Sequence, residues 1–135
     1  MREDTMIRTI AAAALAATLA LPALAQNAEV LGTWRTQPDD NGNYGLVDIS
    51  VCGDAYCGVL VRSFDGAGNE LDSPNTGRQI IWDMRPYGNG HYDDGQIYAP
   101  DRDSTYASEM DLAGNTLTVR GCFIGICRAQ TWTRN

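Results

Sequence analysis

The residues in this sequence whose side chains could catalyse a reaction or bind a metal are four cysteines, one histidine and several close pairs of carboxylates. The cysteines occur in two identical frames, Cys52-x4-Cys57 and Cys122-x4-Cys127. A zinc site or a redox-active dithiol would use C-x2-C spacing, and c-type haem attachment would add a following histidine, so neither frame fits these chemistries. Each frame encloses a short turn. Cysteines that face one another across an antiparallel hairpin lie close to disulfide geometry, so the spacing favours Cys52–Cys57 and Cys122–Cys127 over cross-pairing.

His91 is the single histidine, and it follows a Gly-rich turn. A catalytic histidine needs an ordered nucleophile beside it, and the sequence offers neither a free cysteine nor a Gly-x-Ser-x-Gly elbow once the cysteines are paired. Asp93 with Asp94, and Asp101 with Asp103, are spaced for acid–base work or glycoside cleavage. Both pairs lie among Gly and Pro, where aspartate commonly caps turns. We therefore predict no catalytic residue.

A further acidic stretch, Asp65-x3-Asn69-Glu70-x-Asp72, carries the oxygen ligands that calcium prefers. It lacks the 1,3,5 spacing and the central glycine of an EF-hand loop, so we predict no metal and no other cofactor. The sequence has no phosphate loop, dinucleotide fingerprint or basic–aromatic patch. With 10 arginines, no lysine and a net charge of −7, the chain is also a poor partner for nucleic acid or anionic lipid.

The first 25 residues have the pattern of a cleaved signal peptide. An apolar run over residues 9–21 is followed by Ala23-Leu24-Ala25, which supplies small residues at the −3 and −1 positions, so cleavage is expected before Gln26. The run is too short to span a ~30 Å hydrocarbon core. A start at Met6 would remove two acidic residues and leave the better export signal. No second apolar run follows, so the mature chain is expected in the periplasm or outside the cell, without a membrane span.

Downstream of this segment, apolar and polar residues alternate, and no stretch carries a helical stripe. Val47, Ile49 and Val51, for example, alternate with Asp48 and Ser50. Eight strands are predicted, over residues 31–36, 47–51, 59–62, 80–85, 96–99, 105–112, 116–120 and 128–134. Turn signals separate them, Asp93-Asp94-Gly95 among them, and the long connection over residues 65–77 has no predicted element.

Eight antiparallel strands leave two unpaired edges unless the sheet closes on itself. An up-and-down barrel removes these edges, and eight strands enclose room for side chains or for one small ligand. We therefore predict an all-β fold, an eight-stranded antiparallel up-and-down barrel formed by a single domain over residues 26–135. A sandwich or half-open sheet of the same strands is the alternative.

An ordered set of motifs resembles one known family. The motifs are Gly32-x-Trp34, Cys52-Gly53-x3-Cys57-Gly58, Ile97-Tyr98-x-Pro100 with Tyr106, Arg120-Gly121-Cys122, and Cys127-Arg128-x-Gln130-Thr131-Trp132-Thr133-Arg134. Together they are similar to DUF2147, an exported bacterial domain of unknown function. The resemblance implies a lipocalin-like (calycin) barrel in which Arg134 packs over Trp34, and it implies no settled activity. Ala99 departs from the family, which usually shows Asp in an Ile-Tyr-Asp-Pro turn.

Several aromatic residues on the predicted strands have two interpretations, core packing or an amphipathic pocket with a few polar handles. Alternation places Trp82 with Ile80 and Met84, and Tyr106 with Met110 and Leu112, so both aromatic side chains are expected to point into the barrel. Ser108 lies on the same face as Tyr106, where a hydroxyl needs a partner. The candidate ligand-binding residues are Trp82, Tyr98, Tyr106, Ser108 and Trp132.

The function favoured by these observations is a non-enzymatic barrel that binds a small apolar or amphipathic molecule. Two alternatives remain at this point. One is an envelope protein-interaction module with a filled barrel, and the other is a hydrolase that uses a pair of carboxylates.

Export should remove residues 1–25, because the apolar run and the Ala-x-Ala site meet the requirements of signal peptidase. N-terminal sequencing of the protein recovered from the periplasm or medium should begin at Gln26. An exported protein that begins at Met1 or Met6 would contradict this assignment.

Overall fold

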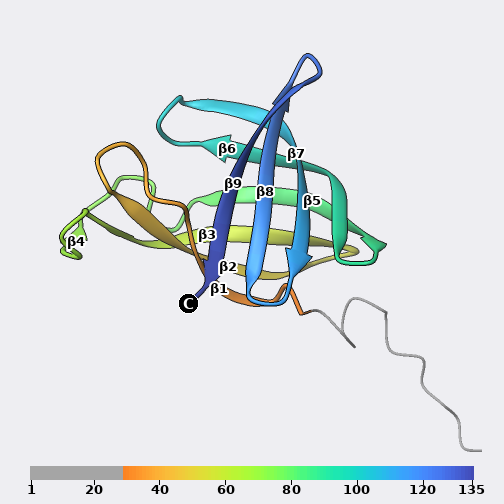
Figure 1. The fold of residues 1–135 in the computed structure, drawn as a ribbon, viewed down its shortest axis with the longest axis horizontal. Coiled ribbons are helices and arrows are strands. Elements are labelled where there is room, and N and C mark those ends of the chain that lie inside the picture. The colour runs from red at the N-terminus through yellow and green to blue at the C-terminus, as the bar shows by residue number, and fades with distance from the viewer. Residues whose placement is uncertain (1–28) are drawn as a thin grey trace, which may run out of the picture.

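The computed structural model describes residues 29–135, which form nine β-strands and no helix (Figure 1). The strands are β1 (Gly32–Arg35), β2 (Tyr44–Cys52), β3 (Ala55–Phe64), β4 (Glu70–Leu71), β5 (Gln79–Gly88), β6 (His91–Ala99), β7 (Ser104–Ala113), β8 (Thr116–Phe123) and β9 (Ile126–Arg134). The described residues include no helix that is long and apolar enough to cross a membrane. The predicted cleavage site before Gln26 lies outside the described residues.

Eight of these strands close into one antiparallel barrel. Around the ring the order is β1, β2, β3, β5, β6, β7, β8 and β9, and β9 returns to pair with β1. Every strand of the ring therefore pairs with the next one along the chain, and only β4 lies outside the ring. The predicted eight-stranded up-and-down barrel is confirmed.

The connection between β3 and β5 contains the short strand β4. The sequence patterns predicted no element there. This two-residue strand pairs with the end of β3. Asp65 closes the turn between them, because its Oδ1 accepts hydrogen bonds from the backbone amides of Ala67 at 2.9 Å and Asn69 at 2.8 Å. Arg62 and Glu70 form a two-pronged ion pair across the same hairpin, at 2.8 and 2.9 Å. The carboxylates of Asp65 and Glu70 are thus used within the hairpin.

The up-and-down order gives the barrel two ends, and the two disulfides lie at opposite ones. We call the end with the β2–β3, β5–β6 and β7–β8 turns the base, and the end with the other four connections the mouth. Cys52–Cys57 bridges the β2–β3 hairpin at the base, and Cys122–Cys127 bridges the β8–β9 hairpin at the mouth. The predicted local pairing is confirmed.

Side-chain packing fills the base half of the barrel. Its fully buried members come from six strands around the ring, so apolar area is removed from water on every side of the interior. They include Trp34 on β1, Val47 on β2, Met84 on β5, Met110 on β7, Leu117 on β8 and Trp132 on β9. The same strands continue toward the mouth, where the inward-facing residues are less buried.

The predicted alternation in β5 is wrong around Asp83. This residue has a left-handed backbone, with φ at 55°, and the irregularity shifts the faces of the strand. Ile81 and Met84 are both fully buried, whereas Trp82 is half-buried and pairs with the exposed Gln96. Because paired residues of antiparallel strands share a face, Trp82 lies on the face of Gln96, where it is partly buried and packs against the edge of the core.

A second local prediction, the turn at Asp93-Asp94-Gly95, is also wrong. The segment lies inside β6, where the pairing with β7 is irregular between Tyr92 and Gly95 and Asp94 has φ at 59°. Gly95 permits the close approach of the neighbouring strand, since a Cβ there would lie 2.7 Å from Met84 Cε. The turn-like residues therefore form a bulge that bends a continuous strand.

The seam that closes the ring is short, because only two residue pairs join β1 to β9. Arg134 reinforces it. Its guanidinium lies 4.3 Å from the centre of the Trp34 ring, and it donates to the carbonyl oxygens of Leu31 at 3.1 Å and Glu29 at 2.6 Å. Its Nε also donates to Asn115 Oδ1 at 3.1 Å, in the β7–β8 turn. One side chain thus ties the last strand to the segment that leads into the first.

Replacing Arg134 with Ala should lower the free energy of unfolding by about 2 kcal/mol, because the cation–π contact and the charged hydrogen bonds across the seam are lost together. Arg128→Ala, on the same strand with an exposed side chain, is the matched control and should change stability little. Urea unfolding measures both. Equal losses for the two variants would show that Arg134 has no special role in closure.

Candidate functional site

The mouth half of the barrel is hollow. It holds a cleft of about 580 Å³, which adjoins a second one of about 470 Å³. Residues common to both linings, including Gln37, Ile97, Ala99 and Gln130, show that the two spaces are neighbours. Each volume lies within the range of about 300–1,000 Å³ that is typical of small-molecule sites.

Three adjacent strands form the inner wall of the larger cleft. Ile97 on β6 pairs with Tyr106 on β7, and Val119, Gly121 and Phe123 follow at alternate positions on β8. A Cβ at Gly121 would meet Ile97 Cγ2 at 3.4 Å and the Cβ of Tyr106 at 3.6 Å, which are ordinary contact distances. Side-chain atoms at this position would therefore occupy the cleft, and the glycine keeps the space open.

Polar side chains surround the opening. Gln37, Asp40, Asp101, Arg102 and Arg128 all line the larger cleft. Gln37 is fixed in place, because its Oε1 accepts a hydrogen bond from the backbone amide of Thr131 at 2.9 Å. Apolar walls below a charged rim are suited to a molecule with an apolar body and a polar end.

Some of the five predicted ligand-binding residues line a cleft and others do not. Tyr106 lines the larger cleft, and Tyr98 and Trp132 line the smaller one. Ser108 and Trp82 line neither. The structure therefore brings three of the five to the hollow mouth of the barrel.

Hydrogen bonds explain the positions of two of these residues. The Tyr98 hydroxyl donates to Asp103 Oδ1 at 2.7 Å, and the Arg78 guanidinium lies 3.4 Å from the centre of the Tyr98 ring. Ser108 is 3% exposed on the inner face, and its hydroxyl donates to the carbonyl oxygen of Arg120 at 2.7 Å. The backbone thus satisfies the polar group that was expected to meet a ligand.

Sequence reasoning missed the contribution of the β8–β9 hairpin. Phe123 and Ile126 line the larger cleft, although they are 64% and 73% exposed, and Ile124 at the tip is 84% exposed. The composition of this turn could have identified it from the sequence, because exposed turns are usually polar and rich in turn-forming residues. Three large apolar residues in such a turn indicate a surface with a function beyond chain reversal.

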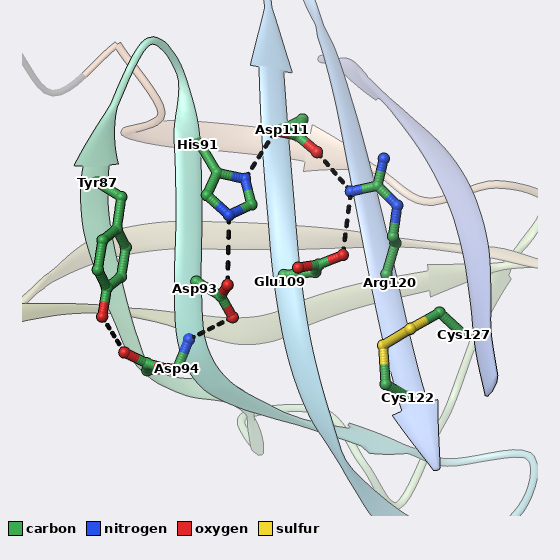
Figure 2. A network of polar contacts seen from close by, with 9 residues as sticks. All are labelled: Tyr87, His91, Asp93, Asp94, Glu109, Asp111, Arg120, Cys122 and Cys127. Carbon is green, nitrogen blue, oxygen red and sulfur yellow. Dashed lines mark hydrogen bonds and ion pairs between the residues drawn. A yellow bond between two sulfur atoms is a disulfide. The ribbon is translucent and has the colours of Figure 1, made fainter. Parts of the chain in front are cut away.

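A separate polar network covers the outer wall of the barrel (Figure 2). His91 Nδ1 lies 2.8 Å from Asp111 Oδ1, and His91 Nε2 lies 3.3 Å from Asp93 Oδ2. Arg120 contacts the Asp111 carboxylate and lies 3.7 Å from Glu109 Oε1. These residues face outward, because the residues of β7 that alternate with Glu109 and Asp111 are the buried ones. Asp93 and Asp94, the carboxylate pair considered for catalysis, therefore have partners within the protein: Asp93 contacts His91, and Asp94 accepts a hydrogen bond from the hydroxyl of Tyr87.

The contacts shift the protonation equilibria of the network. The hydrogen bond with Asp111, together with the weaker one to Asp93, raises the pKa of His91. Arg120, followed by His91, lowers the pKa of Asp111. The imidazolium form of His91 is therefore favoured between its carboxylate partners.

Comparisons with known proteins agree with this architecture. Residues 32–134 match the sequence model of the family described as "Uncharacterized protein conserved in bacteria (DUF2147)". No curated protein sequence matches the chain. A solved structure described as "Protein HP1028 from the human pathogen Helicobacter pylori belongs to the lipocalin family" is similar, with a TM-score of 0.64 and 17% identity over 79% of this chain and 83% of that chain. At this level of identity the likeness shows the fold, a lipocalin-like barrel.

Stability should depend on pH through His91. Folding raises the pKa of His91 above the ordinary value of 6.5, so its stabilising contribution is complete below pH 6.5 and is lost as the pH rises through the folded-state pKa. Urea midpoints measured from pH 5.5 to 8.5 should decline over this window. His91→Asn should remove that decline, and a variant that declines in parallel with the wild type would contradict the assignment.

Proposed function

The chain belongs to the DUF2147 family, and from that premise we propose that it is a non-enzymatic barrel of the bacterial periplasm or exterior that binds a small apolar or amphipathic molecule in the cleft at its mouth. One observation carries the proposal. The interior is packed at the base, around Trp34 and Met110, and is hollow at the mouth, where Gly121 keeps the space open. A barrel that binds no ligand in its interior does not require a packed base together with a hollow mouth.

The lining of the cleft supports the chemical class of the ligand. Tyr106, Val119 and Phe123 offer apolar surface, and burial of apolar area is the main source of affinity in such sites. Arg102 and Arg128 at the rim offer cationic groups to a polar end that stays near water. A molecule with an apolar body and a polar end would use both.

Two features support a location outside the cytoplasm. The first 25 residues carry the pattern of a cleaved signal peptide. All four cysteines are bridged, and disulfides persist in oxidising compartments such as the periplasm. The proposal therefore places binding after export.

An interaction module is the second candidate, favoured by the exposed hairpin of Phe123, Ile124 and Ile126. Exposed apolar groups of this kind mark contact surfaces in many proteins. The hydrolase alternative has less support, because Asp103 accepts a hydrogen bond from Tyr98 and Asp101 lies at the rim of the cleft. The carboxylates of that pair have separate surroundings.

Native mass spectrometry of the protein purified from its own host tests the ligand directly. We expect a co-purified small molecule that is released by organic solvent. Absence of added mass, together with the capture of a stoichiometric protein partner through the β8–β9 hairpin, would favour the interaction module.

Gly121→Leu should weaken binding in the cleft at least tenfold, because the added side chain occupies the space beside Ile97 and Tyr106. The fluorescent probe 1-anilinonaphthalene-8-sulfonate measures the affinity by titration. Ala107→Leu is the matched control, since Ala107 is exposed on the outer face of β7, and it should leave binding unchanged. If both variants bind the probe as the wild type does, the site is not this cleft.

A further inference from the structure

We propose that the outer wall of the barrel carries a binding site for a divalent transition-metal ion, with His91, Asp93 and Glu109 as its protein ligands. One ligand atom from each of the three lies within 4.8 Å of the others. Figure 2 shows the three side chains directed toward one another from the adjacent strands β6 and β7. Three protein ligands around one point leave positions for water or for a further ligand.

The orientation of the imidazole fits metal binding. The 2.8 Å contact between Nδ1 and Asp111 Oδ1 assigns the proton of the neutral ring to Nδ1, because a carboxylate oxygen accepts and does not donate. The lone pair of Nε2 then points toward Asp93, whose Oδ2 lies 3.3 Å away. Two acceptor atoms that face each other require a cation between them, either a proton or a metal ion.

Asp111 and Arg120 have the arrangement of groups that position a metal ligand. A carboxylate on the far nitrogen of a metal-binding histidine fixes its tautomer and ring orientation. Asp111 occupies this place beside His91, and Arg120 in turn contacts Asp111. We assign both as positioning residues that would not touch the ion.

The charge of the cluster matches a divalent cation. Asp93, Glu109 and Asp111 carry three negative charges, and Arg120 carries one positive charge, so two negative charges remain when His91 is neutral. The side chains of His91, Asp93 and Glu109 are 35%, 42% and 30% exposed, so an ion reaches them from solvent.

The donor set selects the kind of ion. An imidazole nitrogen with carboxylate oxygens suits Zn²⁺, Co²⁺, Ni²⁺ or Cu²⁺, whereas Mg²⁺ and Ca²⁺ favour oxygen ligands alone. A neighbouring group of Glu109, Cys122 and Cys127 is also compact. Its sulfurs form a disulfide and are therefore not thiolate ligands. The site is thus assigned around the histidine, with zinc as the probe.

The experiment uses tag-free, oxidised protein treated with EDTA and dialysed. Isothermal titration with ZnCl2 should show one equivalent bound by the wild type. His91→Asn and Glu109→Gln should each weaken binding at least tenfold, and Asp111→Asn should weaken it less. Asp94→Asn is the matched control, because Asp94 lies beside Asp93 on the outer wall and contacts Tyr87. It should bind zinc as the wild type does.

Absorption spectra of the Co²⁺-loaded protein provide a second readout, since bands in the visible region report nitrogen and oxygen ligation and should be lost in His91→Asn. Circular dichroism checks that each variant is folded. Failure of the wild type to bind Zn²⁺, or equal affinity in His91→Asn and Asp94→Asn, would overturn the proposal. Probe binding in the mouth cleft is measured in parallel and should be unaffected, so this site and the proposed ligand site are tested separately.

Discussion

The contact between Arg134 and Trp34 is the interaction on which the rest of this structure depends. β1 is four residues long and shares only two residue pairs with β9, so the backbone alone makes a weak seam. The guanidinium stacks on the indole and binds the backbone that precedes β1. Because this seam closes the ring, the sheet has an inside and an outside, and the mouth cleft is lined from both sides of the seam, by Gln37 after β1 and Gln130 on β9.

Strand β7 shows how one segment serves both sides of the wall. Tyr106 and Met110 face the interior, where they contribute to the cleft and to the core. Glu109 and Asp111 lie between and beyond them on the outer face and join the network with His91. The period of two in a strand thus separates an apolar site from a charged one by the thickness of a single sheet.

The fold could be predicted from the sequence because alternation and paired cysteine frames are local signals. The same signals failed at Asp83 and Asp94, where left-handed backbone inside a strand changes the face without any change in composition. The cleft depends on Gly121 lying beside Ile97, and the network depends on the register that pairs His91 with Asp111. Both are contacts between different strands. The pattern of residues within a single strand does not predict such contacts.

The disulfide at the mouth joins the two strands that carry part of the cleft wall. Phe123 and Ile126 form part of the cleft wall, and each is the immediate neighbour of a bridged cysteine, Cys122 or Cys127. Between them Ile124 has a left-handed backbone, with φ at 48°, a conformation that a β-branched residue adopts only at a cost in energy. The bridge between Cys122 and Cys127 holds the two strands of this hairpin together on either side of that residue. Part of the cleft wall is therefore cross-linked covalently, in a barrel whose other strands, apart from the bridged β2 and β3, are joined across the sheet by hydrogen bonds and side-chain packing.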